Sequence, residues 1–232
     1  MNIVTLSESL SQLTKLKILT LDYNRIFTLP SAISWLTNLE ELHISNNNLL
    51  TLPEFISTLT NLNELQLGDN KLSTLPESIS TLTGLQVLNL NYNQMSTFPS
   101  TIIPLKNIKW LDLGDNAISA VPESISVLTN LITLFLDDNR LTTLPSAIST
   151  LTNLKELNLQ DNPLVRPPLS VAIEGIQSIR EWFEDQSIIP QLKSKTPAKE
   201  MSGNVQRSIQ KNEVSNVIKD VIIVLTIALT CR

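Results

Sequence analysis

The chain has one cysteine, one histidine and five glycines among 232 residues, and 4% of its residues are aromatic. The single cysteine, Cys231, excludes an intramolecular disulfide framework and a cysteine-based metal site. Around the single histidine, His43, no Ser-His-Asp or Cys-His arrangement and no His/Cys metal cluster can be assembled. We therefore expect His43 to be a polar surface residue. Because no phosphate-binding glycine loop occurs either, the sequence predicts a non-enzyme without metal or cofactor.

Signals for secretion are also lacking. The first ten residues have no basic region and no apolar core of signal-peptide length, and no Asn-x-Ser/Thr acceptor occurs in the chain. These absences favour a reducing, cytoplasmic location. The apolar run at residues 221–231 is too short for an ordinary membrane-spanning helix, although it leaves membrane-peripheral attachment open as an alternative.

What the sequence does contain is a repeat of 23 residues. Six complete repeats begin at residues 16, 39, 62, 85, 108 and 131, and a seventh begins at residue 154. All 42 frame positions of the complete repeats are apolar, so the periodicity does not come from chance. An asparagine recurs in every repeat and is expected to form a structural ladder: Asn24, Asn47, Asn70, Asn93, Asn116, Asn139 and Asn162.

The spacing within one repeat predicts its local structure. The segment L-x-x-L-x-L ends in alternation, which is typical of a short strand with one buried face. The asparagine follows where the chain turns, and its amide can both donate to and accept from backbone groups. The segment L-P-x-x-I-x-x-L then spaces apolar residues by three, which suits a short helical or 3₁₀ return. One repeat cannot bury its own leucines, so stacking of neighbours must do so.

The full frame, L-x-x-L-x-L-x-x-N-x-L-x-x-L-P-x-x-I-x-x-L, resembles the 23-residue Ras-suppressor-like class of leucine-rich repeats. That class includes intracellular scaffolds, plant intracellular Ras-group proteins, Roco-like proteins and bacterial relatives. The resemblance covers about residues 6–186. It implies an α/β fold: a curved, right-handed solenoid with a parallel β-sheet on the concave face and short 3₁₀ or helical returns on the convex face. It also implies protein–protein recognition, often in signalling, without identifying the partner.

The sequence further predicts how the ends are organised. We expect a repeat domain at residues 1–186, with a partial N-terminal repeat at 1–15 and a C-terminal cap at about 163–186. The cap should contain a helix whose core includes Trp182 and Phe183. The N-terminal sheet edge belongs to a truncated chain, is blunted only by the first five residues, or is paired with a partner or a second copy. We expect residues 187–232 to form a disordered basic tail with an apolar end at 221–231.

Charge indicates the kind of partner. Residues 1–186 carry 10 Lys/Arg against 19 Asp/Glu, and residues 187–232 carry 7 against 3. Of 28 strand positions expected on the concave face, ten are acidic and none is Lys or Arg. Such a face favours a basic protein or peptide and disfavours nucleic acid. The acids could instead serve only for solvation, and the basic tail could fold back onto them.

Two aromatic residues are candidate anchors for a partner. Trp110 and Phe135 should lie on adjacent strands, two residues out of register, so their rings could meet on the concave face. The alternative is an aromatic pair that merely covers the sheet. The sequence thus predicts an interaction scaffold, with a membrane-peripheral or tail-tethered adaptor as the alternative. The predicted partner-binding residues are Trp110, Phe135, Asp112, Asp115, Asp137, Asp138, Tyr92, Glu64, Asp69 and Glu41.

Overall fold

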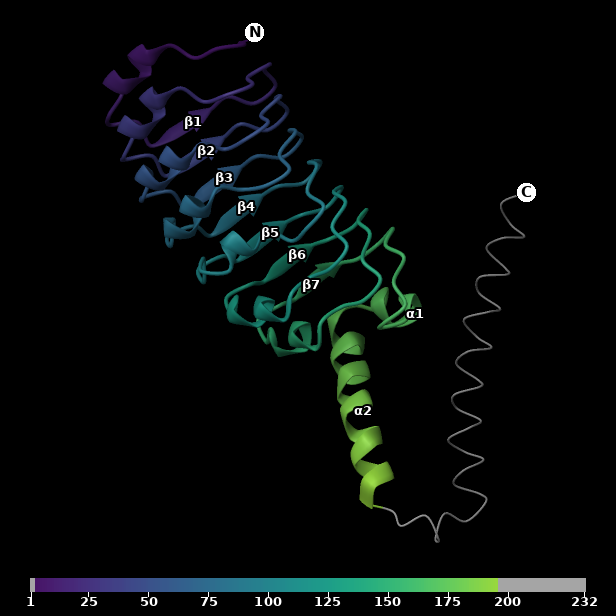
Figure 1. Cartoon of the computed structure of the whole chain (residues 1–232). Coiled ribbons are helices and arrows are strands. Elements are labelled where there is room, and N and C mark those ends of the chain that lie inside the picture. Colours follow the sequence, from purple (N-terminus) through teal and green to yellow (C-terminus); the bar gives the residue numbers. More distant parts are fainter. Residues whose placement is uncertain (1–2, 196–232) are drawn as a thin grey trace, which may run out of the picture. The chain divides into compact units, whose positions relative to one another are not determined.

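The computed structural model describes residues 3–195 of the chain, and side chains as far as residue 187. Contacts divide the chain into a first unit, residues 1–180, and a second unit, residues 181–232. The first unit contains one parallel sheet whose seven strands follow the order of the sequence (Figure 1). This confirms the predicted repeat solenoid. The strands are β1 (Ile18–Thr20), β2 (Glu41–His43), β3 (Glu64–Gln66), β4 (Val87–Asn89), β5 (Trp110–Asp112), β6 (Thr133–Phe135) and β7 (Glu156–Asn158).

The strand register follows the repeat without a slip. Each strand residue pairs with the residue 23 positions later, as Leu42 does with Leu65 and Leu65 with Leu88. These central leucines are fully buried, because successive side chains of a strand point to opposite faces and the leucine takes the inner one. The outer face therefore carries the first and third residue of each strand, and it forms the concave surface.

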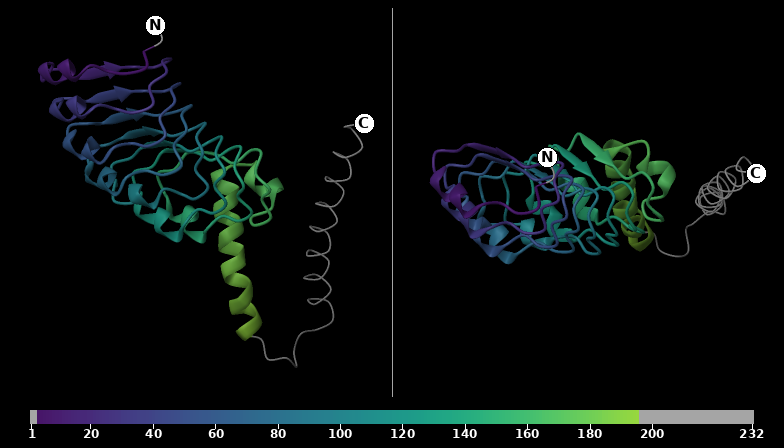
Figure 2. Two further views of the ribbon diagram at one scale, coloured as in Figure 1. Left: turned by 45° about the horizontal axis from the view of Figure 1, so that its top comes forward. Right: turned by 90° about the horizontal axis from the view of Figure 1, so that it is seen from above.

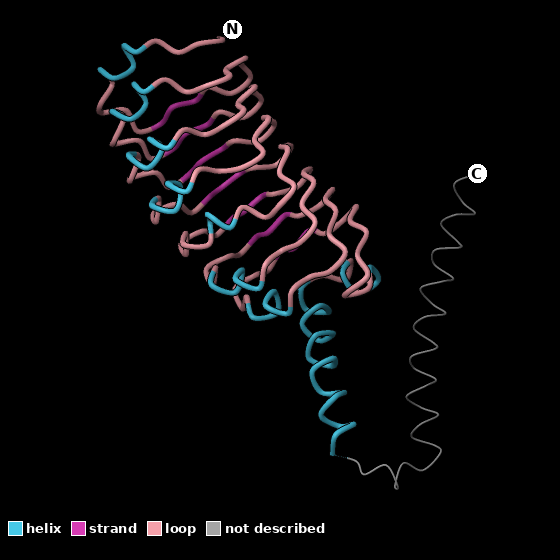
Figure 3. The backbone as a smooth tube through the Cα atoms, viewed as in Figure 1, coloured by secondary structure: helices cyan, strands magenta, loops and turns pink. Residues whose placement is uncertain are grey.

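Short 3₁₀ helices return the chain on the side opposite the sheet (Figures 2 and 3). From η2 on, each begins directly after a proline, such as Pro53, whose carbonyl accepts the N–H of Ile56 at 3.0 Å. The proline is thus the N-cap rather than the first helical residue. In η1, Ser7 takes this place, and its Oγ accepts the N–H of Ser9. The helices are η1 (Glu8–Gln12), η2 (Ser31–Trp35), η3 (Glu54–Thr58), η4 (Glu77–Thr81), η5 (Ser100–Ile102), η6 (Glu123–Val127) and η7 (Ser146–Thr150).

The recurring asparagine ties each repeat to the one before it. Asn47 Nδ2 donates to the carbonyl of Leu21, 26 residues earlier, at 2.9 Å, and Asn47 Oδ1 accepts the N–H of Ile26 at 2.9 Å. Its amide also donates to carbonyls of its own turn. Asn70, Asn93, Asn116, Asn139 and Asn162 make the same set of bonds. An apolar residue could not satisfy these backbone groups.

After the last repeat the chain forms two helices instead of the single helical stretch that the sequence predicted. They are α1 (Leu169–Ala172) and α2 (Ile176–Lys195). Gly175 separates them with a φ of +98°, a conformation that favours glycine. Ile179 at the start of α2 is fully buried, and Arg180 Nη2 donates to the carbonyl of Leu151 at 2.6 Å. These contacts close the apolar end of the last repeat in the first unit.

Within the second unit, Trp182 and Phe183 are half-buried and pack edge to face, with ring centroids 5.0 Å apart. Helix α2 runs beyond the predicted limit of the cap at residue 186. The predictions for residues 196–232, including Cys231 and the apolar run at 221–231, lie outside the described residues. Among the residues described, no helix is both long and apolar enough to cross a membrane.

Candidate functional site

The outer face of the sheet brings most of the predicted site residues into two groups. The larger group lies on β4 to β6 and the turns that follow them. We call it the acidic–aromatic cluster, and it comprises Tyr92, Trp110, Asp112, Asp115, Phe135, Asp137 and Asp138. The smaller group spans β2 and β3 and includes Glu41 and Glu64. Asp69 is exposed in the turn after β3 and belongs to neither group.

Trp110 and Phe135 form the apolar part of the acidic–aromatic cluster. Trp110 is the register partner of Thr133, and Phe135 is that of Asp112, so the two aromatic residues are diagonal neighbours on adjacent strands. Their ring centroids are 5.8 Å apart with an interplanar angle of 81°. This edge-to-face geometry is a favourable aromatic contact, and both rings remain half-exposed. The pair therefore offers apolar surface on a face that is otherwise polar.

Asp112 lies deeper than the sequence suggested. Its side chain is next to Phe135 in the register, and the residue is only 7% exposed. Its Oδ1 accepts the N–H of Gly114 at 2.9 Å. Burial raises the pKa of Asp112 to about 6, and the charges of Asp137 and Asp115 act in the same direction. Both burial and the neighbouring carboxylates thus oppose the ionised form of Asp112.

Three more carboxylates gather in the turns beside it. Ligand oxygens of Asp115, Asp137 and Asp138 lie within 4.8 Å of one another. Burial raises the pKa of Asp115, and the negative charge of Asp138 adds to the effect. The negative charge of Asp115 raises the pKa of the Tyr92 hydroxyl. The cluster therefore concentrates negative charge that no described Lys or Arg pairs with.

Backbone conformation and a missing side chain make this arrangement possible. Tyr92, Asp115 and Asp138 all have a positive φ, between 47° and 49°, which turns the chain sharply after each strand. Gly114 leaves space for neighbouring acids, because a Cβ there would lie 3.0 Å from Asp137 Oδ1 and 3.2 Å from Asp112 Oδ1. The sequence alone does not show which side chains fill this space.

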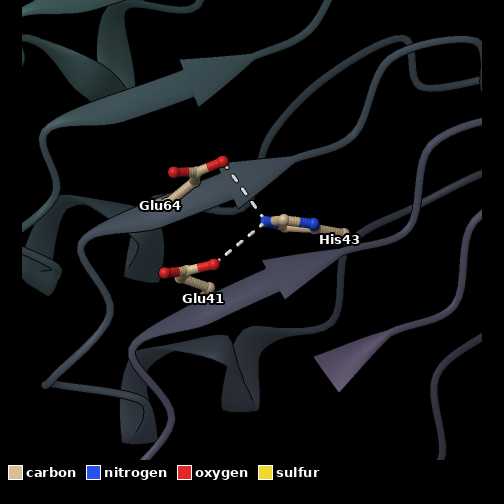
Figure 4. Close-up of side chains that lie close together, drawn as sticks. All are labelled: Glu41, His43 and Glu64. Carbon is tan, nitrogen blue, oxygen red and sulfur yellow. Dashed lines mark ion pairs between the residues drawn. The ribbon is translucent and has the colours of Figure 1, made fainter. Parts of the chain in front are cut away.

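Two functional candidates were missed from the sequence. The Asn91 side chain lowers the pKa of Asp112, against the effect of burial, and its Oδ1 occupies the space that a Cβ at Gly68 would fill. His43 lies between Glu41 and Glu64 rather than standing alone on the surface (Figure 4). The position of His43 could have been predicted from the sequence. Glu41 and His43 are two residues apart on one strand, so their side chains share a face, and Glu64 is the register partner of Glu41. The sequence prediction excluded a His/Cys cluster around His43 and did not include Glu41 and Glu64 as its neighbours.

Comparisons with known proteins agree with this architecture. The profile of a leucine-rich repeat region matches residues 77–181, and that of the leucine rich repeat matches residues 37–95. No curated protein matches the sequence. A solved leucine-rich repeat protein of Leptospira interrogans is 39% identical with a TM-score of 0.68, and the match covers 69% of this chain and 41% of that one.

Two further solved structures are similar. Internalin C2 of Listeria monocytogenes is 31% identical with a TM-score of 0.64, over 71% of this chain and 70% of that one. The plant peptide hormone receptor RGFR1, solved in complex with RGF2, is 28% identical with a TM-score of 0.57, over 68% of this chain and 30% of that one. The chain thus spans less than half of the Leptospira protein and of the plant receptor, and more than two thirds of the internalin.

Proposed function

The chain belongs to the leucine-rich repeat family, and we propose that it is a non-enzymatic scaffold that binds a basic protein or peptide through its acidic–aromatic cluster. Proteins of this family are generally protein-interaction modules, and one similar structure, the plant receptor, was solved in complex with RGF2. The proposal for this chain rests on the residues of its own concave face.

The observation that carries the proposal is the position of the Trp110–Phe135 pair beside unpaired carboxylates. Aromatic rings surrounded by polar groups are frequent anchors of protein interfaces. A lysine or arginine from a partner could pack against the half-buried Trp110 and at the same time reach Asp112. Such a cation would favour the ionised form of Asp112, which burial and neighbouring acids now oppose. The cluster would therefore gain more from a basic partner than ordinary surface acids would.

The distribution of basic residues supports the same partner class. Lys17 forms an ion pair with Glu40, and the side chains of both residues are exposed. Neither residue belongs to the acidic–aromatic cluster. A face with carboxylates and no internal counter-charge attracts positive partners and speeds their encounter. It repels phosphate backbones, which disfavours nucleic acid.

We also propose a cytoplasmic signalling role, as the resemblance to the Ras-suppressor-like class implies. The alternative, an adaptor held at a membrane through residues 221–231, makes a different prediction for cell fractionation. Deleting residues 217–232 should leave the distribution of a cytoplasmic scaffold unchanged. A shift from the membrane to the soluble fraction would favour the tethered adaptor.

The proposed anchor can be tested by affinity capture. We expect replacement of both Trp110 and Phe135 by Ala to reduce capture of the partner at least tenfold, because hot-spot aromatics typically contribute 2 kcal/mol or more. The matched control is Trp35→Ala, since Trp35 is 64% exposed but belongs to η2 on the return side of the solenoid. Mass spectrometry of the captured proteins, compared among the three chains, measures the effect.

The dependence of capture on salt concentration distinguishes an interface formed by charges from a purely apolar one. Capture by the unmodified chain should fall between 50 mM and 500 mM salt, because screening weakens attraction between exposed charges. The proposal fails if the double alanine variant folds and captures the same proteins as the Trp35→Ala control. A partner retained equally at both salt concentrations would contradict the assignment of a basic partner.

A further inference from the structure

Apart from the acidic–aromatic cluster, the concave face carries a second group of side chains that converge on one point. Glu41 and His43 extend from β2, and Glu64 extends from the neighbouring strand β3 (Figure 4). One oxygen of each glutamate and one imidazole nitrogen all lie within 4.8 Å of one another. Parallel pairing fixes this arrangement, because Glu41 is in register with Glu64 and His43 lies two residues further along β2.

The contacts of His43 Nε2 are unusual for a hydrogen-bonded histidine. Glu64 Oε1 lies 3.2 Å from this nitrogen and Glu41 Oε2 lies 3.6 Å from it. The nitrogen is shielded from solvent, yet it makes no hydrogen bond to any described residue. The two oxygens thus lie close to the nitrogen without the alignment that an N–H donor requires. Ligands arranged around a shared ion are expected to show this geometry.

The distances suit a tetrahedral ion. With metal–ligand bonds of about 2.05 Å, two ligand atoms of a tetrahedral zinc site lie about 3.3 Å apart. The two nitrogen–oxygen distances of 3.2 Å and 3.6 Å lie on either side of that value. A small movement of the glutamate side chains, which are about one third exposed, would complete the site. The same exposure gives an ion a path from solvent.

We propose that Glu41, His43 and Glu64 form a binding site for a divalent transition-metal ion of the zinc type. One imidazole and two carboxylates are ligands that zinc accepts, and water would fill the fourth position. Magnesium and calcium prefer sets made of oxygen alone, so the imidazole selects against them. Two carboxylates with a neutral imidazole also balance the charge of the ion.

A neighbouring side chain supports the position of one ligand. Gln66 Nε2 donates to Glu64 Oε1 at 3.1 Å, and Gln66 is the register partner of His43. Hydrogen bonds of this kind orient carboxylate ligands in metal sites. Within the acidic–aromatic cluster, the carboxylates of Asp115, Asp137 and Asp138 have comparable spacing, but no imidazole lies among them. They therefore provide an internal comparison.

The test uses zinc alone and the full chain with Cys231→Ser, so that the single thiol cannot contribute. Isothermal titration with Zn²⁺ should show one site per chain. We expect His43→Gln to weaken zinc binding at least tenfold, and Glu41→Gln and Glu64→Gln to do the same. The control Asp137→Asn with Asp138→Asn should retain the affinity, because it leaves the imidazole site intact. Magnesium in excess should not displace zinc.

Nuclear magnetic resonance gives a second readout that does not depend on variants. His43 is the only histidine, so every imidazole signal of the unmodified residue reports on it. Zinc should shift these signals in proportion to site occupancy, with the ion on Nε2 and the proton on Nδ1. Unshifted imidazole signals at saturating zinc, or equal affinity in His43→Gln, would overturn the proposal. Because no protein partner is needed, failure here leaves the proposed scaffold function untouched.

Discussion

At the scale of single residues, the folded environment of Asp112 disfavours the ionised form of its carboxyl group. Its pKa rises from an ordinary value of 3.8 to about 6, mainly through burial. Between these two pH values the folded chain holds a proton that the unfolded chain has lost. The free energy of unfolding should therefore decrease as the pH rises from about 4 to about 6, and the full cost of the charge is present above that range.

Asp112→Asn tests this prediction, because an amide oxygen can still accept the N–H of Gly114 while carrying no charge. The pKa change corresponds to at most about 3 kcal/mol. An amide oxygen accepts the N–H of Gly114 more weakly than a carboxylate does, so the expected gain at pH 8 is about 1–2 kcal/mol. Urea unfolding at pH 4, 6 and 8 measures it, and the difference from the unmodified chain should vanish at or below pH 4. A variant equally stabilised at every pH would show that charge is not the cause.

At the scale of the repeat element, a second row of asparagines accompanies the buried ladder. These exposed side chains donate across one repeat, as Asn61 does to the carbonyl of Thr37 and Asn107 to that of Thr83, both at 2.8 Å. The row is interrupted at Gly84, the position between them. A Cβ at Gly84 would lie 3.8 Å from the carbonyl oxygen of Thr60 and 3.6 Å from that of Leu62, which is ordinary contact.

We therefore expect Gly84→Asn to stabilise the chain. The new side chain can donate to the carbonyl of Thr60. Replacing glycine also lowers the conformational entropy of the unfolded state, which raises the free energy of unfolding by about 0.4–1 kcal/mol. An exposed hydrogen bond adds roughly 0.5–1 kcal/mol. The control Gly84→Ala should gain only the first contribution. Equal melting temperatures of the two variants, measured by calorimetry, would contradict the role assigned to the amide.

The elements were largely predictable because one pattern fixes them all. The alternation in L-x-x-L-x-L determines which leucine faces inward, and Pro53 and its equivalents mark where each return begins. The break at Gly175 was not predicted, since apolar spacing alone cannot distinguish one helix from two. Its positive φ is a property of the backbone that the hydrophobic pattern does not encode.

At the scale of the whole molecule, the sequence predicted which residues of the candidate site lie on neighbouring strands, but not which side chains are buried or in contact. Regular register allowed Trp110 and Phe135 to be placed as diagonal neighbours from residue numbers alone. The setting of Asp112 involves Phe135 on the neighbouring strand β6 and Asn91 in the turn after β4. The setting of His43 likewise depends on Glu64 of another repeat. Side-chain contacts across strands are set by three-dimensional packing, so a sequence frame cannot supply them.

The same stacking makes stability depend on position along the solenoid, because each repeat contacts only its neighbours. Asn139 joins two interior repeats through bonds to the carbonyl of Leu113 at 2.9 Å and the N–H of Ile118 at 2.8 Å. Asn24, near the first repeat, donates only within its own turn and accepts one N–H from Ile3. Asn139→Ala should therefore cost about 2–4 kcal/mol, since it leaves the buried N–H of Ile118 without a partner and removes the bond to the carbonyl of Leu113.

Asn24→Ala is the matched control and should cost about 1 kcal/mol, because it affects one contact at the end of the stack. Denaturant unfolding of both variants gives the two free energies, and hydrogen exchange locates the damage. In Asn139→Ala, amides on both sides of the interface between β5 and β6 should lose protection, because the interior interface holds the two parts of the stack together. Equal costs for the two substitutions would mean that the amides act within their own turns, and that the leucine core alone joins the repeats.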